Sequence, residues 1–255
     1  MRLALLLLLL PAAALAQPAE PPVPTVPATP TADDLLDAMD KTLQFDTRTS
    51  RSTMTVVDGD RTRAYELQSF ARGTDDAAVE YLSPPRDKGT RMLKKKDDLW
   101  LYMPRAERTQ KISGHMLRQG MMGSDISYED MMQAADFRKR YAATVLGEEE
   151  LAGRPCWKLE AVARDSTVSY PRRLIWIDKE TMVPVRQELF AVSGMLLKTW
   201  EMSDVRQIEG RWTAMKMELA DKLRQGSKTV LTLESVTYGV ALKDEVFSLR
   251  WLERK

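Results

Sequence analysis

The chain has 255 residues, and its 38 lysine and arginine side chains nearly balance its 37 aspartate and glutamate side chains. A formal charge of +1 gives no electrostatic support for binding nucleic acid, which requires a concentration of positive charge. The single cysteine, Cys156, excludes an internal disulfide, so the fold has to be stabilised by packing.

The first sixteen residues have the features of a secretory signal peptide. Arg2 precedes an apolar run over residues 3–10, and Ala14-Leu-Ala16 places small residues where a signal peptidase cleaves. The run is too short for a membrane-spanning helix, which needs about 20 residues. No cysteine lies near the predicted cleavage site, so lipid attachment is not expected. The sequence therefore predicts export to the periplasm, with cleavage after Ala16 and no lipid anchor.

Residues 17–30 contain six prolines alternating with alanine, valine and threonine, which is typical of an extended, disordered spacer. Residues 31–255 are expected to form a single domain. Its first element is predicted to be a helix, because Thr31 and the acids after it can cap the N-terminus, and apolar residues from Leu35 to Leu43 recur at helical spacing.

From Arg51 onward, short runs of alternating side chains are divided by turn signals such as Asp58-Gly-Asp60. The runs around residues 157–161 and 215–219 each have one apolar and one polar face, as expected for an antiparallel sheet covered on one side. There are roughly eleven such segments, whereas an open twisted sheet rarely exceeds about ten strands. The predicted fold is mainly β with a few helices, built on a strongly curved antiparallel sheet or partial barrel.

Residues 114–135 interrupt the strand pattern, and five methionines lie there: Met116, Met121, Met122, Met131 and Met132. The spacing Ser127-x-x-Asp130 resembles a helix-capping box. This segment is predicted to be a helical plug or lid over the concave face. Methionines of this kind either conform to apolar ligands of varied shape or fill gaps in a core, and the sequence leaves both interpretations open.

Trp100 and Tyr102 alternate with Leu101 and Met103, so both faces of one predicted strand are apolar. Either that strand is buried on both sides, or one of its sides lines a cavity.

The sequence has no recognisable catalytic or phosphate-binding motif. His115 is interpreted as a surface or loop histidine, and Cys156 as a structural cysteine that opens a strand. The acids Asp125, Glu129 and Asp130 do not have the spacing of a calcium loop, so capping and turn hydrogen bonds explain them more simply. No metal or cofactor is expected.

The chain resembles the periplasmic outer-membrane lipoprotein-sorting proteins, relatives of the carrier LolA and its receptor LolB. Four segments support the resemblance: Leu99-Trp-Leu-Tyr-Met-Pro104, Met122-Gly-Ser-Asp-Ile-Ser-Tyr-Glu-Asp130, Tyr170-Pro-Arg-Arg-Leu-Ile-Trp-Ile-Asp178 and Asp244-Glu-Val-Phe-Ser248. The resemblance implies a half-open antiparallel barrel with an apolar concave face, partly closed by helices, that accommodates acyl chains.

The expected function is therefore a non-enzymatic, monomeric carrier of lipid or lipoprotein acyl chains, with an apolar cavity large enough for hydrocarbon tails. Its partners would include an inner-membrane lipid exporter of the resistance-nodulation-division type and an outer-membrane acceptor, and no nucleic acid. The expected cavity residues are Trp100, Leu101, Tyr102, Met103, Met121, Met122 and Trp176. The expected lid and capping residues are Ser124, Asp125, Ser127, Glu129 and Asp130.

For the cavity wall, Trp100, Tyr102 and Trp176 are taken to face inward, while Leu101 and Met103 are the alternative to the first two. Two other functions stay open. One is a hydrolase or transferase acting on envelope lipids with Asp125 and Glu129, which would need perturbed, paired carboxyl groups. The other is an envelope scaffold that docks partners on its sheet and needs no cavity.

Overall fold

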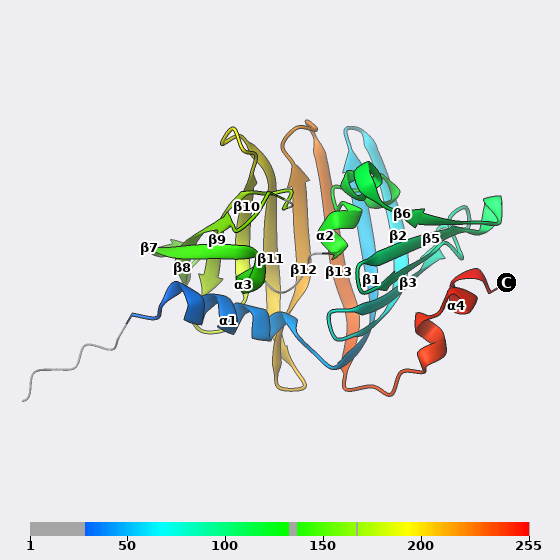
Figure 1. Ribbon diagram of the computed structural model, residues 1–255, viewed down its shortest axis with the longest axis horizontal. Helices are drawn as coiled ribbons and strands as arrows, with labels where there is room; N and C mark the ends of the chain where they lie inside the picture. The colour runs from blue at the N-terminus through cyan, green and yellow to red at the C-terminus, as the bar shows by residue number, and fades with distance from the viewer. Residues whose placement is uncertain (1–28, 133–136, 167, 255) are drawn as a thin grey trace, which may run out of the picture. The chain divides into compact units, whose positions relative to one another are not determined.

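The alternating segments form thirteen strands among the described residues, and these pair into one antiparallel sheet in the computed structural model (Figure 1). The structure describes residues 29–132, 137–166 and 168–254. The predicted signal peptide, and the predicted spacer up to residue 28, lie outside the described residues. Thr31–Lys255 forms one compact unit.

The strands are β1 (Thr47–Asp58), β2 (Arg61–Arg72), β3 (Asp76–Ser83), β4 (Arg91–Lys95), β5 (Asp98–Met103), β6 (Arg108–Ile112), β7 (Tyr141–Leu151), β8 (Arg154–Ala163), β9 (Arg172–Asp178), β10 (Pro184–Phe190), β11 (Leu196–Ile208), β12 (Arg211–Asp221) and β13 (Ser227–Tyr238). The α-helices are α1 (Ala32–Leu43), α2 (Tyr128–Met132), α3 (Phe137–Arg140) and α4 (Leu249–Glu253). The 3-10 helices are η1 (Pro104–Ala106), η2 (Gly114–Arg118), η3 (Met121–Gly123) and η4 (Asp244–Phe247).

The strand order is β6-β5-β4-β3-β2-β1-β13-β12-β11-β10-β9-β8-β7. Strand β1 pairs with β13, so the first strand and the last lie side by side at the middle of the sheet. In this central region, Met54 of β1 lies opposite Leu231, Leu231 opposite Met217, and Met217 opposite Met202 of β11. These four apolar residues therefore lie side by side across four strands.

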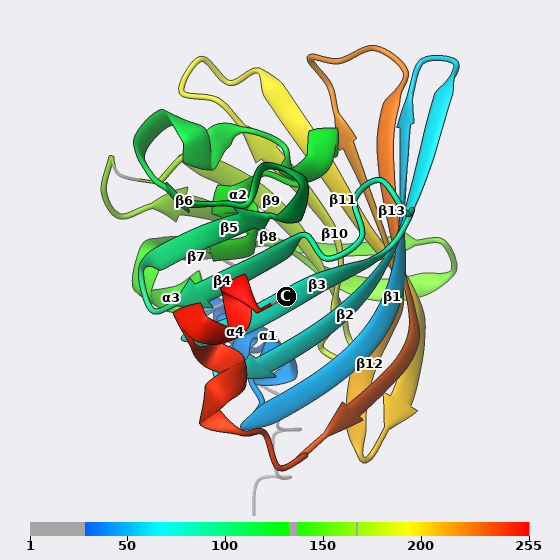
Figure 2. The ribbon, with the colours of Figure 1, turned by 90° about the vertical axis from the view of Figure 1, so that its right-hand side faces the viewer.

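The two faces of the sheet carry different helices. Figures 1 and 2 show α1, α2 and α3 on one side of the sheet, which we call the inner face, and α4 on the other side of β3–β5, the outer face. Two apolar clusters lie on the inner face. The first inner cluster includes Met54, Tyr65, Tyr81, Leu101, Met121 and Tyr128, and the second includes Leu36, Met39, Phe137, Tyr141, Leu159 and Ile175.

Helix α1 begins where the sequence predicts. Thr31 Oγ1 accepts a hydrogen bond from the Asp34 backbone N–H at 3.1 Å, and the Thr31 N–H donates to Asp34 Oδ2 at 3.0 Å, which is a capping box. Leu35, Leu36 and Met39 are buried against β7–β9 within the second inner cluster.

The predicted fold class is confirmed in its main features: the described chain is mainly β, with one antiparallel sheet and a few helices. Strands β6 and β7 stand at opposite ends of the strand order, so the sheet is open and is not curled into the predicted partial barrel. Among the described residues, no helix combines the length and hydropathy needed to cross a bilayer.

Candidate functional site

The most unusual part of the inner face is the segment over residues 114–132, which we call the methionine-rich cover. It consists of three short helices, η2, η3 and α2, in place of the longer helix that covers the second inner cluster. Its apolar side chains pack into the first inner cluster: Met116, Leu117, Met121, Met122, Ile126, Tyr128, Met131 and Met132. The protein's own side chains therefore occupy this half of the inner face.

A capping box starts the last helix of the cover. The Ser127 N–H donates to Asp130 Oδ2 at 2.8 Å, and the Asp130 N–H donates to Ser127 Oγ at 3.1 Å. Ser124 closes the turn before it, because its Oγ accepts from the Ile126 N–H at 3.3 Å. These short-range bonds shape the cover but do not attach it to the sheet.

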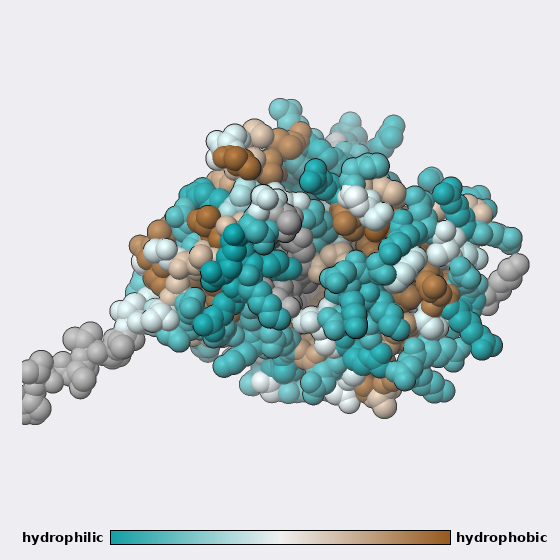
Figure 3. Space-filling view, in the orientation of Figure 1, coloured by the Kyte–Doolittle hydropathy of each residue, from teal (hydrophilic) through white to brown (hydrophobic). Residues whose placement is uncertain are grey.

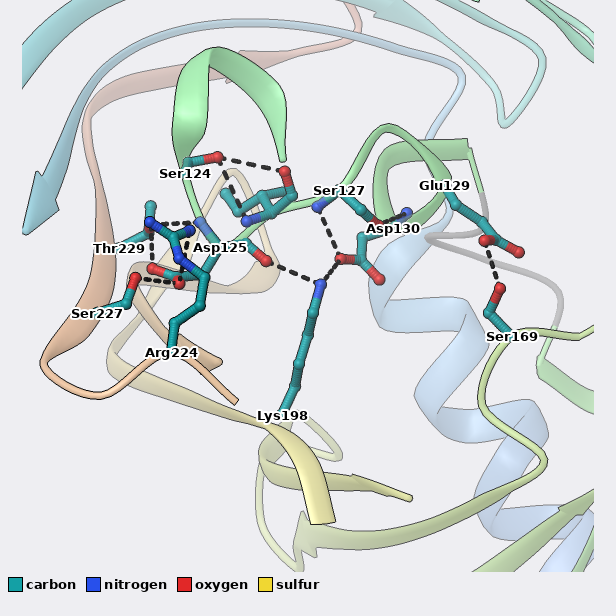
Figure 4. A network of polar contacts seen from close by, with 11 residues as sticks. Ser124, Asp125, Ser127, Glu129, Asp130, Ser169, Lys198, Arg224, Ser227 and Thr229 are labelled. Carbon is teal, nitrogen blue, oxygen red and sulfur yellow. Dashed lines mark hydrogen bonds and ion pairs between the residues drawn. The ribbon is translucent and has the colours of Figure 1, made fainter. Parts of the chain in front are cut away.

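Asp125 attaches the cover to β13. Its backbone N–H donates to Thr229 Oγ1 at 2.8 Å, and its carboxylate accepts from that hydroxyl at 2.7 Å and from Ser227 Oγ at 2.5 Å (Figure 4). Arg224 Nη1 lies 3.6 Å from the same carboxylate. Asp125 is only 2% exposed, so a buried charge with several hydrogen bonds holds the cover at this point.

Lys198 attaches the cover to β11. Its Nζ donates to Asp130 Oδ2 at 2.7 Å and to the Asp125 carbonyl at 2.8 Å (Figure 4). The side chains of Lys198 and Asp130 are 11% and 1% exposed. Because both charges are buried, removing one partner is expected to cost about 3–5 kcal/mol. Asp130 therefore caps α2 and also supplies the counter-charge for a buried lysine of the sheet.

Beside the cover, the inner face has apolar residues that are only half-buried. Trp200, Met202, Met217 and Leu231 lie on the central strands β11–β13, and we call them the central apolar row. Three of them pack against the first inner cluster: Trp200, Met217 and Leu231. Within the described chain, Trp200 Nε1 is buried without a hydrogen-bond partner. The sequence indicated alternation in β12 and β13, but the row depends on which strands become neighbours.

The predicted cavity residues do not lie on one face. Leu101, Met103, Met121 and Met122 belong to the first inner cluster. The prediction that Trp100 and Tyr102 face the same cavity is wrong, because side chains alternate along β5 and these two point to the outer face, where they pack in a cluster with residues of η4 and α4.

The prediction that Trp176 lines the cavity wall is also wrong, because alternation along β9 places it on the outer face. It packs with Cys156 and Val185, whereas its neighbours Ile175 and Ile177 point inward to the second inner cluster. The alternative set, Leu101 and Met103, is the one that the structure places on the inner face.

The polar residues considered for catalysis have structural contacts. Glu129 accepts a hydrogen bond from Ser169 Oγ, while Asp125 is bound by β13. His115 is exposed in η2. Cys156 is buried, and this burial raises the pKa of its thiol, with Asp178 adding to the effect. Across the described ranges, no group of three His, Cys, Asp or Glu residues could hold a metal ion.

Two surface pockets of about 510 and 530 Å³ lie outside the first inner cluster. The first is lined by charged residues of α1 and the α3 region, including Asp37 and Arg138, and the second by polar residues around Arg72 and Asp76. On the side drawn in Figure 3, hydrophilic residues dominate, and hydrophobic residues form separate patches. Where the sequence predicts an apolar hollow, the side chains of the methionine-rich cover pack on the first inner cluster.

Comparison with solved structures places this sheet and its helices in a known class. The chain has a LolA-like fold, which confirms the resemblance indicated by the four sequence segments. A family model with the description "Uncharacterized protein" matches residues 73–254, so the chain belongs to that family. None of the curated proteins matches the chain.

Three solved structures define the likeness. A DUF1329 family protein from Desulfovibrio piger has 25% identity and a TM-score of 0.80, covering 86% of this chain and 96% of its own. A Vibrio parahaemolyticus domain named for outer membrane lipoprotein sorting has 22% identity and a TM-score of 0.77, covering 86% and 98%. A LolA superfamily protein from Nitrosomonas europaea has 23% identity and a TM-score of 0.72, covering 88% and 100%. The last two likenesses establish the fold alone.

Proposed function

We propose that this protein is a periplasmic carrier that binds acyl chains of lipids or lipoproteins on the inner face of its open antiparallel sheet. The observation that supports the proposal is the packing of the methionine-rich cover, built of short helices, beside the half-buried central apolar row. A ligand that displaces the cover would extend its tail over Trp200, Met217 and Leu231. The LolA-like fold supports the same role.

A carrier has to release its cargo as well as shelter it. Burying a sixteen-carbon chain is worth roughly 12 kcal/mol at about 0.8 kcal/mol per methylene. Retained in full, that free energy would make release very slow. When the cover packs on the empty face, its methionines replace part of the cargo's contacts, so the net free energy of cargo binding is lower. We expect cover and cargo to compete for one apolar surface.

Transfer of this kind needs no chemical step. The direction of transport would follow from differences in affinity among a donor, the carrier and an acceptor. An inner-membrane exporter and an outer-membrane acceptor are the partners that we propose. The carboxylates considered for an envelope hydrolase, those of Asp125 and Glu129, accept hydrogen bonds from Ser227 and Ser169, which favours the carrier.

A disulfide between the cover and the sheet tests the proposal. Thr229 Oγ1 lies 2.8 Å from the Asp125 backbone nitrogen and 2.7 Å from its carboxylate, so the two side chains are in contact and are the pair to replace in a variant with Asp125→Cys and Thr229→Cys. The oxidised variant should lose binding of a fluorescent C16 fatty acid, and reduction should restore it. Single-cysteine variants under the same oxidant are the control. Equal binding by the oxidised and reduced forms would show that the cover does not compete with cargo.

A further inference from the structure

Two buried cations lie in the same row of the inner face. Arg173 of β9 is opposite Leu189 of β10, and Leu189 is opposite Lys198 of β11. Arg173 is 7% exposed and Lys198 is 9% exposed. A buried charge is costly unless it is paired and hydrogen-bonded, so the partners of each cation need an explanation.

The partners of Arg173 are neutral. Its Nε donates to Tyr141 Oη at 2.8 Å, and its Nη1 donates to Gln187 Oε1 at 3.2 Å. Its guanidinium also lies 5.0–5.2 Å from the ring centroids of Phe137, Tyr141 and Tyr170. Among the residues that the structure describes, no carboxylate forms an ion pair with Arg173. Aromatic rings, a tyrosine hydroxyl and one amide oxygen hold the guanidinium in place without neutralising it.

The counter-charge of Lys198 comes from the cover. Asp130, the carboxylate that Lys198 contacts, belongs to the segment that we propose to be displaced. Tyr170 lies beside both cations, with its ring centroid 5.2 Å from the Arg173 guanidinium and 5.7 Å from Lys198 Nζ. Burial raises the pKa of Tyr170, and the Asp130 carboxylate adds to that effect. Departure of the cover would therefore leave two cations beside Tyr170, neither of them paired with a carboxylate.

We propose that Arg173 and Lys198 bind the anionic headgroup of the cargo, and that Asp130 occupies the place of that headgroup when the cover is closed. This inference rests on the proposed carrier function and specifies its ligand: an amphiphile with a phosphate or carboxylate group. Lys198 and Trp200 are two residues apart on one face of β11, about 7 Å along the strand. A headgroup at Lys198 thus places its tail at the start of the central apolar row.

Matched ligands test the headgroup assignment. Dodecyl phosphate and its neutral dimethyl ester have the same tail, and inorganic phosphate has the same anion without a tail. Isothermal titration calorimetry below the micellar concentration should give an affinity for dodecyl phosphate at least about tenfold above that for the ester, since charge-assisted hydrogen bonds are the strong ones. Inorganic phosphate should bind far more weakly than either tailed compound.

Variants identify the cations. Arg173→Met should abolish the preference for dodecyl phosphate and leave ester binding intact. Arg172→Met is the matched control, because Arg172 precedes it on β9, faces outward and pairs with Glu160. The double variant Lys198→Met with Asp130→Asn removes both charges together, so no buried ion is left unpaired. It should also lose the preference, and its binding of the ester shows that the inner face is folded.

Each of the following outcomes would overturn one part of the proposal. If the wild-type protein binds both tailed compounds equally, the headgroup assignment is wrong while the carrier function stands. If it binds neither compound, the carrier function is wrong. If inorganic phosphate binds as tightly as dodecyl phosphate, the cations form a site for small anions. If Arg172→Met loses the preference for dodecyl phosphate as Arg173→Met does, the preference comes from the overall charge of the protein and not from this site.

Discussion

The two halves of the inner face are covered in different ways. The second inner cluster lies under α1, a twelve-residue helix with a capping box and buried leucines. The first inner cluster lies under the methionine-rich cover, whose helices have three to five residues each. Helices so short are not stable by themselves, so tertiary contacts must hold the cover in place. Under the proposed function, the half beneath α1 would be a permanent core, and the half beneath the methionine-rich cover would have a removable plug.

The polar contacts of the methionine-rich cover with the sheet are few and buried. The cover is joined to β11 and β13 by a few buried, charged hydrogen bonds from Lys198, Asp125 and Thr229. Such bonds are strong when complete and costly when broken, so the attachment is expected to be close to all-or-none. Flexible thioethers on the rest of the segment pack without demanding one geometry. Under the proposed function, the cover would have a defined closed state and would leave the sheet without breaking the strand pairing.

The largest effect should come from Asp130→Ala. This change leaves Lys198 buried without its counter-charge. We therefore expect the closed state of the cover to be destabilised by about 3–5 kcal/mol. Hydrogen exchange should accelerate over residues 114–132 and stay slow in α1. Asp244→Ala is the control, because Asp244 pairs with Arg72 at an exposed site, where about 0–1 kcal/mol is expected. Equal acceleration in α1 would show that the two halves open together.

The next largest effect is expected for Leu36→Ala in α1. Leu36 is fully buried, and removing such a side chain costs about 2–5 kcal/mol in the free energy of unfolding. Urea denaturation should show the loss as global unfolding, with exchange in the cover changed no more than elsewhere. Binding of the C16 fatty acid by the folded variant should match the wild type. If the fully folded variant binds the fatty acid more weakly, α1 is part of the ligand site. The two halves of the inner face would then not differ in function.

The sequence predicts α1 and the strand alternation better than it predicts which residues line the inner face. The capping box at Thr31 and the alternation in β8 and β12 depend on neighbouring residues, and both were predictable. The orientation of Trp100 was not, because both faces of β5 are apolar and the outer one is buried by a helix about 150 residues later in the chain. Local pattern cannot indicate which of two apolar faces a distant segment will cover.

The inner cations were missed for a related reason. Arg173 lies within the segment Tyr170–Asp178 that supported the resemblance, yet a basic residue in a strand usually faces water. Lys198 contacts a carboxylate 68 positions away, through a strand order that places β11 under α2. In both cases the informative observation is burial, which follows from the assembled sheet. A charged residue in an otherwise apolar alternation is the sequence signal that could have identified them.

The smallest effect is expected for Thr31→Ala, which removes the cap of α1 and should cost about 1 kcal/mol at neutral pH. The hydrogen bonds from Thr31 lower the pKa of Asp34 below its ordinary 3.8. A carboxyl group whose pKa is lowered by folding contributes stability above its unfolded pKa and loses it as the pH falls through the folded value. The difference in the free energy of unfolding between wild type and variant should therefore narrow below about pH 3.8. Urea denaturation at several pH values measures it. A free-energy difference that is constant with pH would mean that the Asp34 carboxylate does not take part in the cap. The hydroxyl of Thr31 alone would then fix the start of α1.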